Sequence, residues 1–218
     1  MSTDEELKRL AHADYWDERY SGVGPDQQVH EWFRSFGDLK DFFQRNIFQV
    51  RAPETAPKIL HLGSGDSTIP QDLAERGYTS QICVDFSTAV VEIMSKRHAH
   101  IDGIQWTQMD IRHMDSISSQ CIDFAFDKGT LDAMIHGSPW SPPLEVLENT
   151  GQYLGEVLRV LKANGAFLYI TYRQPHFIKP LLQREGLDWD IQIETLGGSD
   201  SSFGYYGFIC KPKKDGEN

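Results

Sequence analysis

The stretch that decides the fold is Ile59-Leu60-His61-Leu62-Gly63-Ser64-Gly65-Asp66-Ser67-Thr68, in which an apolar run leads into Gly-x-Gly. Open α/β sheets begin a nucleotide pocket in this way, because glycine permits the sharp turn and brings backbone amides to the ligand. A second apolar run ends at Asp85, 20 residues after Gly65. This spacing is typical of a carboxylate that binds both ribose hydroxyls. Together the features favour a ribose-containing ligand, although each alone also fits an ordinary turn or a helix cap near Ser87.

The dinucleotide fingerprint lacks its third glycine, because Thr68 occupies that position. A small residue there would let a pyrophosphate and the helix approach closely. We therefore expect a cofactor that carries ribose and adenine without a pyrophosphate, and S-adenosylmethionine meets this description. No paired ligands at short spacing indicate a zinc site, so no metal is expected.

Acidic residues also follow the third and fourth apolar runs. Asp110 would accept the exocyclic amine of adenine while Ile111 packs on the ring, or it could be a solvated turn residue. The fourth run ends in Asp-Lys-Gly-Thr-Leu-Asp at residues 127–132, which brings two carboxylates, an amine and a glycine to the rim of the site. Helix capping is the simpler explanation of that segment taken alone. Ligands of open α/β sheets collect at the carboxyl ends of the strands, which favours one site built from all four ends.

Apolar runs alternate with helical stretches after a linker bracketed by Pro53 and Pro57, and this alternation predicts a Rossmann-like α/β fold. We expect a mostly parallel seven-stranded sheet with helices on both faces and an antiparallel C-terminal hairpin. The predicted strands are residues 58–62, 81–84, 104–107, 122–126, 166–172, 189–195 and 205–211. The predicted helices between them are residues 69–76, 88–98 and 147–161, and helical patterning at 4–20 and 36–50 predicts two helices before the sheet.

Length and composition indicate one domain over residues 1–218, with a Rossmann-like core at 58–211 and a flexible tail at 212–218. The net charge of -11 disfavours nucleic acid and anionic membranes as partners and fits a basic protein or a small molecule better. No signal peptide and no membrane-spanning run is recognisable, and the three cysteines resemble core residues of a reducing compartment. We therefore expect a cytoplasmic protein.

Several segments closely resemble the class I S-adenosylmethionine-dependent methyltransferases of the methyltransferase-like group, and within it the eukaryotic elongation factor 1-alpha lysine methyltransferases. The resemblance extends from about Tyr15 to Lys211, and its most specific elements are Tyr-Trp-Asp-x-Arg-Tyr and Lys-Gly-Thr-Leu-Asp. The matching segments are residues 15–20, 31–33, 62–67, 84–87, 97–100, 109–112 and 127–133.

The resemblance implies a protein lysine N-methyltransferase that uses S-adenosylmethionine and acts on elongation factor 1-alpha. It implies that residues 1–50 form a helical lid over the cofactor. Because a nearby carboxylate favours the ammonium form of an amine, we expect Asp127 and Asp132 to orient the acceptor amine and not to act as general bases. We assign no catalytic residue. The expected cofactor-binding residues are Trp16, Tyr20, Trp32, Gly63, Gly65, Asp85, Phe86, Asp110, Ile111 and Lys128.

Two positions depart from the family pattern: His61 stands where many relatives carry an acidic residue, and Asp127 where relatives often have glutamate. Two alternative functions stay open, a small-molecule methyltransferase of secondary metabolites and a cofactor-binding scaffold protein without turnover. Residues 135–143 are loop-like and include Trp140, and they form a candidate substrate lip. A lip of residues 135–143 that closes over the mouth of the site would favour a small molecule, whereas an open acidic groove would favour a protein.

Overall fold

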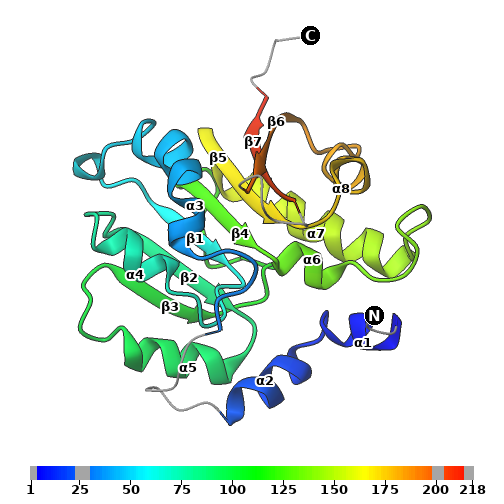
Figure 1. The fold of residues 1–218 in the computed structure, drawn as a ribbon, viewed down its shortest axis with the longest axis horizontal. Helices are drawn as coiled ribbons and strands as arrows, with labels where there is room; N and C mark the ends of the chain where they lie inside the picture. The colour runs from blue at the N-terminus through cyan, green and yellow to red at the C-terminus, as the bar shows by residue number, and fades with distance from the viewer. Residues whose placement is uncertain (1–3, 23–29, 198–203, 214–218) are drawn as a thin grey trace.

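The computed structural model describes residues 4–22, 30–197 and 204–213 of the chain. Within these ranges the chain forms a sheet of seven strands in the order β3-β2-β1-β4-β5-β7-β6 (Figure 1). Every pairing is parallel except those of β7, which runs antiparallel to both β5 and β6. The predicted fold class is thus confirmed. The strands are β1 (Ile59–Leu62), β2 (Gln81–Asp85), β3 (Ile104–Gln108), β4 (Ile122–Lys128), β5 (Leu161–Thr171), β6 (Trp189–Leu196) and β7 (Tyr205–Pro212).

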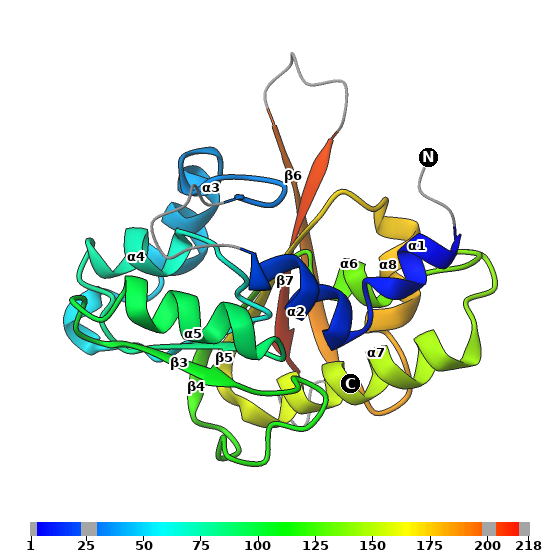
Figure 2. The ribbon, with the colours of Figure 1, turned by 90° about the horizontal axis from the view of Figure 1, so that it is seen from below.

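Helices cover both faces of this sheet, as Figures 1 and 2 show. The N-terminal helices α1 and α2 contact α6 and α5, respectively, beside the sheet. Short π-helical and 3-10 segments, Gln44–Phe48 and Pro53–Thr55, follow α3. The α-helices are α1 (Asp4–Arg9), α2 (Ala13–Ser21), α3 (Phe36–Phe43), α4 (Ile69–Ala74), α5 (Thr88–Arg97), α6 (Thr130–Met134), α7 (Leu144–Val160) and α8 (Pro175–Leu182).

The central strands bury side chains on both faces and separate two hydrophobic cores. Phe124 and Phe126 of β4 pack in the core with α3 and α4, whereas Ala125 between them packs in the core with α7 and α8. This alternation is the period of two along a strand. Fully buried parallel strands appear in a sequence as near-continuous apolar runs, which is why they were recognisable.

The N-terminal helical stretch predicted at residues 4–20 is two helices, so residues 4–22 and 30–58 contain three α-helices before the sheet where two were expected. The chain turns at Leu10, Ala11 and His12, whose amides bond to carbonyls three residues earlier. The indole of Trp16 donates to the carbonyl of Leu10 at 2.8 Å. These bonds give partners to backbone groups at the end of α1 that a continuous helix would pair internally. Charge patterning contains no information on these bonds, and for that reason it does not reveal the break.

Two helices were not predicted, and both positions have a local reason. α6 has only five residues, which is too short to show periodicity. α8 contains Pro175 in its first turn and Pro180 inside it. Proline is compatible with the first turn but disfavours a helix interior. The burial of Ile178, Leu181 and Leu182 stabilises α8 all the same.

Candidate active site

A cavity of about 220 Å³ lies where the carboxyl ends of β1, β2, β3 and β4 meet the N-terminal segments. All ten residues predicted to bind the cofactor line it, together with Asp132 and His61. Such convergence follows from the topology, since parallel strands end at the same edge of a sheet. The N-terminal wall consists of Leu7, Leu10, Ala11, Trp16, Tyr20, Trp32 and Phe33.

The glycine loop after β1 adopts the conformation that its sequence predicts. Gly63 and Gly65 have φ values of +61° and +52°, a region that side-chain-bearing residues rarely adopt. A side chain at Gly63 would also collide with Thr130 at the start of α6. Both glycines are therefore needed to bring the loop against the cavity.

Asp85 at the end of β2 is buried and holds the glycine loop in place. Its two carboxylate oxygens accept hydrogen bonds from the amides of Gly65 at 2.9 Å and Ser87 at 3.0 Å. Burial raises the pKa of Asp85 to about 6. Each oxygen keeps a lone pair that a ribose hydroxyl can use, so the donor set required by an adenosyl group fits this strand end.

Asp110 after β3 is engaged by the neighbouring guanidinium. Arg112 donates to its carboxylate from Nε at 3.0 and 3.1 Å and from Nη2 at 2.6 Å. Burial raises the pKa of Asp110, but the hydrogen bonds and charge of Arg112 outweigh it and hold the pKa below its usual value. Ile111 is buried and lines the cavity beside it. An adenine amine would therefore meet an ionised carboxylate here.

Aromatic side chains from α2 form part of the cavity wall. The rings of Trp16 and Tyr20 stack at 6.0 Å, and Trp16 meets Trp32 edge-on at 5.7 Å. Asp17 lies between Trp16 and Tyr20 in the sequence and was not predicted as a site residue. It accepts a hydrogen bond from the hydroxyl of Ser87 at 2.6 Å. Asp17 thus ties α2 to the segment after β2, and its place in the Tyr-Trp-Asp motif was the available signal.

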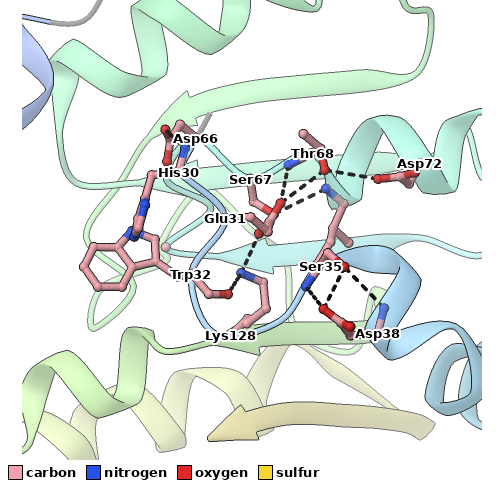
Figure 3. Close-up of polar contacts among 12 residues, drawn as sticks. His30, Glu31, Trp32, Ser35, Asp38, Asp66, Ser67, Thr68, Asp72 and Lys128 are labelled. Atoms are coloured by element: carbon pink, nitrogen blue, oxygen red, sulfur yellow. Dashed lines mark hydrogen bonds and ion pairs between the residues drawn. The ribbon is translucent and has the colours of Figure 1, made fainter. Parts of the chain in front are cut away.

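Glu31 is the second residue that sequence reasoning missed, although it belongs to the Glu-Trp-Phe segment of the resemblance. Figure 3 shows its carboxylate between Ser67, Thr68 and Lys128. It accepts from the hydroxyl of Ser67 at 2.8 Å and the amide of Thr68 at 2.9 Å, and Nζ of Lys128 lies at 2.6 Å. Burial raises the pKa of Glu31, but Lys128 and these hydrogen bonds outweigh it, so the pKa is lowered.

Lys128, the last residue of β4, also donates to the backbone carbonyl of Trp32 at 2.6 Å (Figure 3). Its ammonium therefore holds residues 30–33, which we call the strap. The amide of His30 adds a bond to the carboxylate of Asp66 at 3.0 Å. These contacts fasten the strap to the glycine loop, beside the aromatic wall.

The two carboxylates predicted at the rim have different surroundings. Asp127 is fully buried and does not line the cavity. It accepts from the amides of Thr130 and Leu131 at 2.8 and 2.9 Å and from the hydroxyl of Tyr153 at 2.8 Å. Burial raises its pKa to about 7. Asp127 therefore holds the start of α6 against α7, which does not match its expected place at the rim.

Asp132 does line the cavity, and its position is set by β5. The hydroxyls of Tyr169 and Thr171 each donate to its carboxylate at 2.7 Å, and Nε of Arg173 lies at 3.2 Å. Burial raises the pKa of Asp132, while these hydrogen bonds and the charge of Arg173 oppose the shift. The rim thus carries one oriented carboxylate with a cation beside it.

His61 is a neutral member of the cavity lining. Its Nε2 lies 2.7 Å from Oε1 of Gln81, whose amide nitrogen donates to the carbonyls of Pro70 and Tyr78. Burial lowers the pKa of His61 to about 4. Gln81 therefore presents its oxygen, and the imidazole donates to it, so this position, where the resemblance leads one to expect an acidic residue, is uncharged.

This sheet order and this cavity define a class I S-adenosylmethionine-dependent methyltransferase. Residues 54–194 match the family described as "Methyltransferase domain", and the chain belongs to this family. It is 32% identical over 205 residues to EEF1A lysine methyltransferase 4 of Bos taurus, covering 92% of this chain and 75% of that protein. The Mus musculus protein of the same name is 34% identical over 199 residues, at 89% and 73% coverage.

Among solved structures, a Leishmania major S-adenosylmethionine-dependent methyltransferase has the same fold, with a TM-score of 0.62 at 12% sequence identity. The match covers 93% of this chain and 86% of that one.

Within the described ranges, no three histidine, cysteine or acidic side chains are grouped to hold a metal ion. None of the helices in the described part of the chain has the length and hydrophobicity needed to cross a membrane.

Proposed function

We propose that this protein is a protein lysine N-methyltransferase that acts on translation elongation factor 1-alpha. The observation that carries the proposal is solvent access to the rim of the cavity at Tyr172, which follows Thr171, a hydrogen-bond partner of Asp132. Tyr172 at this rim is 45% exposed, and none of the residues 135–143, all of which the structure describes, lines the cavity. A side chain of a folded protein can therefore reach the site. The two relatives named EEF1A lysine methyltransferase 4 support the same acceptor.

The residues that would hold S-adenosylmethionine are those of the four strand ends and the aromatic wall. Asp85 would bind the ribose, Asp110 and Ile111 the adenine, and the amides after Gly63 the polar end of the ligand. Bound S-adenosylmethionine supplies an electrophilic methyl group on a sulfonium. Trp16, Tyr20 and Trp32 would exclude water and face the positive charge with their rings. In this proposal α1, α2 and the strap act as the lid.

The protein's remaining task is to align a neutral acceptor amine with the methyl group. An amine near a cation loses its proton more readily, whereas a carboxylate favours the ammonium form. Asp132 is compensated by Arg173 at 3.2 Å, so it can accept a hydrogen bond from the amine without fixing it as an ammonium ion. We assign Asp132 an orienting role, and the amine's proton leaves to solvent.

The proposal is tested with radiolabelled S-adenosylmethionine and unmethylated elongation factor 1-alpha produced in bacteria. We expect wild-type protein to label the factor on lysine, as located by mass spectrometry of the product, and Asp85→Ala to lose the label. Bound cofactor without transfer to any component of a eukaryotic lysate would instead support a scaffold protein.

A small-molecule methyltransferase is the second candidate, because the cofactor half of the site would look the same. Resolving the labelled lysate by size separates the two. Label confined to small molecules would overturn the proposed protein substrate and leave the cofactor assignment intact.

A further inference from the structure

Phe33 has a backbone conformation that is rare for a phenylalanine. Its φ is +61°, in the region that favours glycine. The amide of Arg34 donates to the carbonyl of Trp32 at 2.7 Å, so Phe33 is the central residue of a three-residue turn. Turns of this kind with positive φ are strained, and such strain persists only where the surroundings enforce it.

The surroundings of Phe33 enforce it from both sides. The carbonyl of Trp32 accepts a second hydrogen bond from Nζ of Lys128 at 2.6 Å. Glu31, the residue before Trp32, is bonded through its carboxylate to the glycine loop. On the other side, Ser35 and Asp38 form a capping box at the start of α3 (Figure 3). The strained residue is therefore clamped between two anchored segments.

The clamped backbone brings the ring of Phe33 to the rim of the cavity that it lines. The ring meets Tyr172 edge-on, with centroids 5.3 Å apart at 85°. It also packs on Gly129, where an added Cβ would lie 3.0 Å from the Phe33 ring. Gly129 has a φ of +97°, so this position has two reasons to lack a side chain. The loop after β4 thus leaves room for the Phe33 ring.

Phe33 and Tyr172 stand at the end of the cavity away from the expected ribose and adenine contacts. Asp85 is the last residue of β2 and Asp110 follows β3, whereas Tyr172 follows β5 and Asp132 belongs to α6 after β4. A ligand held at β2 and β3 reaches the β4–β5 half with its other end. The acceptor must enter through this half.

We propose that Phe33 and Tyr172 form an aromatic portal that receives the acceptor lysine side chain and determines how tightly the acceptor binds. This inference rests on the proposed function and extends it to the substrate-binding residues. Aromatic rings bind the apolar methylene stem of a lysine and attract its ammonium or methylammonium group. Asp132 lies in the same lining to orient the nitrogen. Lys128 and Glu31 are positioning residues that act through the backbone of the strap.

The test separates acceptor binding from cofactor binding in purified full-length protein. We would compare Phe33→Ala and Tyr172→Ala with Tyr172→Phe, which keeps the ring, and with Phe48→Ala as a matched control. Phe48 is also half-buried and packs on the rings of Phe43 and Tyr78 in the α3–α4 core, away from the cavity. The readouts are KM and kcat for elongation factor 1-alpha, and calorimetric Kd for S-adenosylhomocysteine.

The expected result is a KM for the protein acceptor raised about tenfold in Phe33→Ala and Tyr172→Ala, which corresponds to roughly 1.4 kcal/mol. The Kd of S-adenosylhomocysteine should change by less than about twofold, since the rings contact the acceptor. Phe48→Ala should match the wild type in KM, whereas Tyr172→Phe, which keeps the ring, should raise the KM less than Tyr172→Ala does. Binding of the elongation factor to protein saturated with S-adenosylhomocysteine gives a readout without turnover, and it should weaken in the same two variants.

One outcome is that the wild type methylates the factor and that Phe33→Ala and Tyr172→Ala have the same acceptor KM and the same acceptor binding as the wild type. That result would overturn the portal and leave the proposed function intact. A loss that appears equally in Kd for S-adenosylhomocysteine would also overturn it, because the rings would then belong to the cofactor site. Absence of transfer by the wild type to any protein would overturn the proposed function and the portal with it.

Discussion

Nζ of Lys128 lies 2.6 Å from Oε1 of Glu31, and the two side chains are only 5% and 18% exposed. This ion pair joins the end of β4 to the strap, and so connects the strand ends that line the cavity with its N-terminal wall. Removing two charges from water is unfavourable unless both are hydrogen-bonded. Here Lys128 also donates to the carbonyl of Trp32. The carboxylate of Glu31 also accepts from the hydroxyls of Ser67 and Thr68 and from the amide of Thr68. The pair therefore specifies where the strap lies.

We predict that Glu31→Gln weakens S-adenosylhomocysteine binding by about tenfold and lowers the free energy of unfolding by about 3 kcal/mol. The reason is that it leaves a buried, uncompensated ammonium. Calorimetry and chemical denaturation measure the two effects. Glu194→Gln is the matched control, because Glu194 pairs with the 52%-exposed Arg45 at 2.6 Å. Breaking an exposed pair should cost at most about 1 kcal/mol. Equal effects of both substitutions would contradict the role of the strap.

Cofactor binding should depend on the ionisation of Asp85. Its pKa of about 6 is raised by burial, so below that pH the carboxyl group is protonated and accepts hydrogen bonds poorly. The affinity for S-adenosylhomocysteine should therefore rise as the pH increases from about 5 to about 7. In Asp85→Asn we expect weak binding without this pH dependence. A wild-type Kd that is flat across the same range would contradict the assignment.

Asp127 and Asp132 should separate into a folding role and a substrate role. Asp127→Asn disturbs the buried bonds to Thr130, Leu131 and Tyr153. We expect it to lower the free energy of unfolding by about 2 kcal/mol while transfer per folded molecule is retained. Asp132→Asn should reduce kcat/KM for the protein acceptor by at least about tenfold with little change in cofactor Kd. Denaturation and steady-state kinetics on both variants check this division, and a reversal of the two patterns would contradict it.

Two glycine substitutions should have opposite signs. Gly63→Ala forces a side chain into the positive-φ position against Thr130, and we expect loss of cofactor binding together with at least about 2 kcal/mol of stability. Gly155 lies within α7, where an added Cβ would meet nothing within 4 Å. Gly155→Ala should raise the free energy of unfolding by about 0.5–1 kcal/mol. Denaturation of both variants measures this contrast, which fails if Gly155→Ala destabilises.

The fold was predictable because its signals are local and repeated. The alternation of buried strands with helices and the spacing from Gly65 to Asp85 require only near neighbours in the sequence. The partners of Glu31 illustrate the limit. Ser67, Thr68 and Lys128 lie in distant segments, and no periodicity marks a carboxylate that packs across such separations.

The break between α1 and α2 and the short α6 were missed for a similar reason. The turn at Leu10 is stabilised by the indole of Trp16, and α6 by the carboxylate of Asp127 at its first amides. Helix propensity describes a segment in isolation, whereas these bonds come from side chains outside each turn.

The sequence by itself determined which residues gather at the cavity, because parallel strands end at one edge and their terminal residues must meet there. Only the tertiary structure decided what each carboxylate does. Asp127 and Asp132 belong to one short motif, yet Asp127 points toward Tyr153 of α7 while Asp132 lines the cavity. Asp127 belongs to β4 and Asp132 to α6, and the sequence of this short motif carries no record of which neighbouring helix or cavity each carboxylate meets. That choice is made when the helices pack, and it assigns one carboxylate to folding and the other to the site.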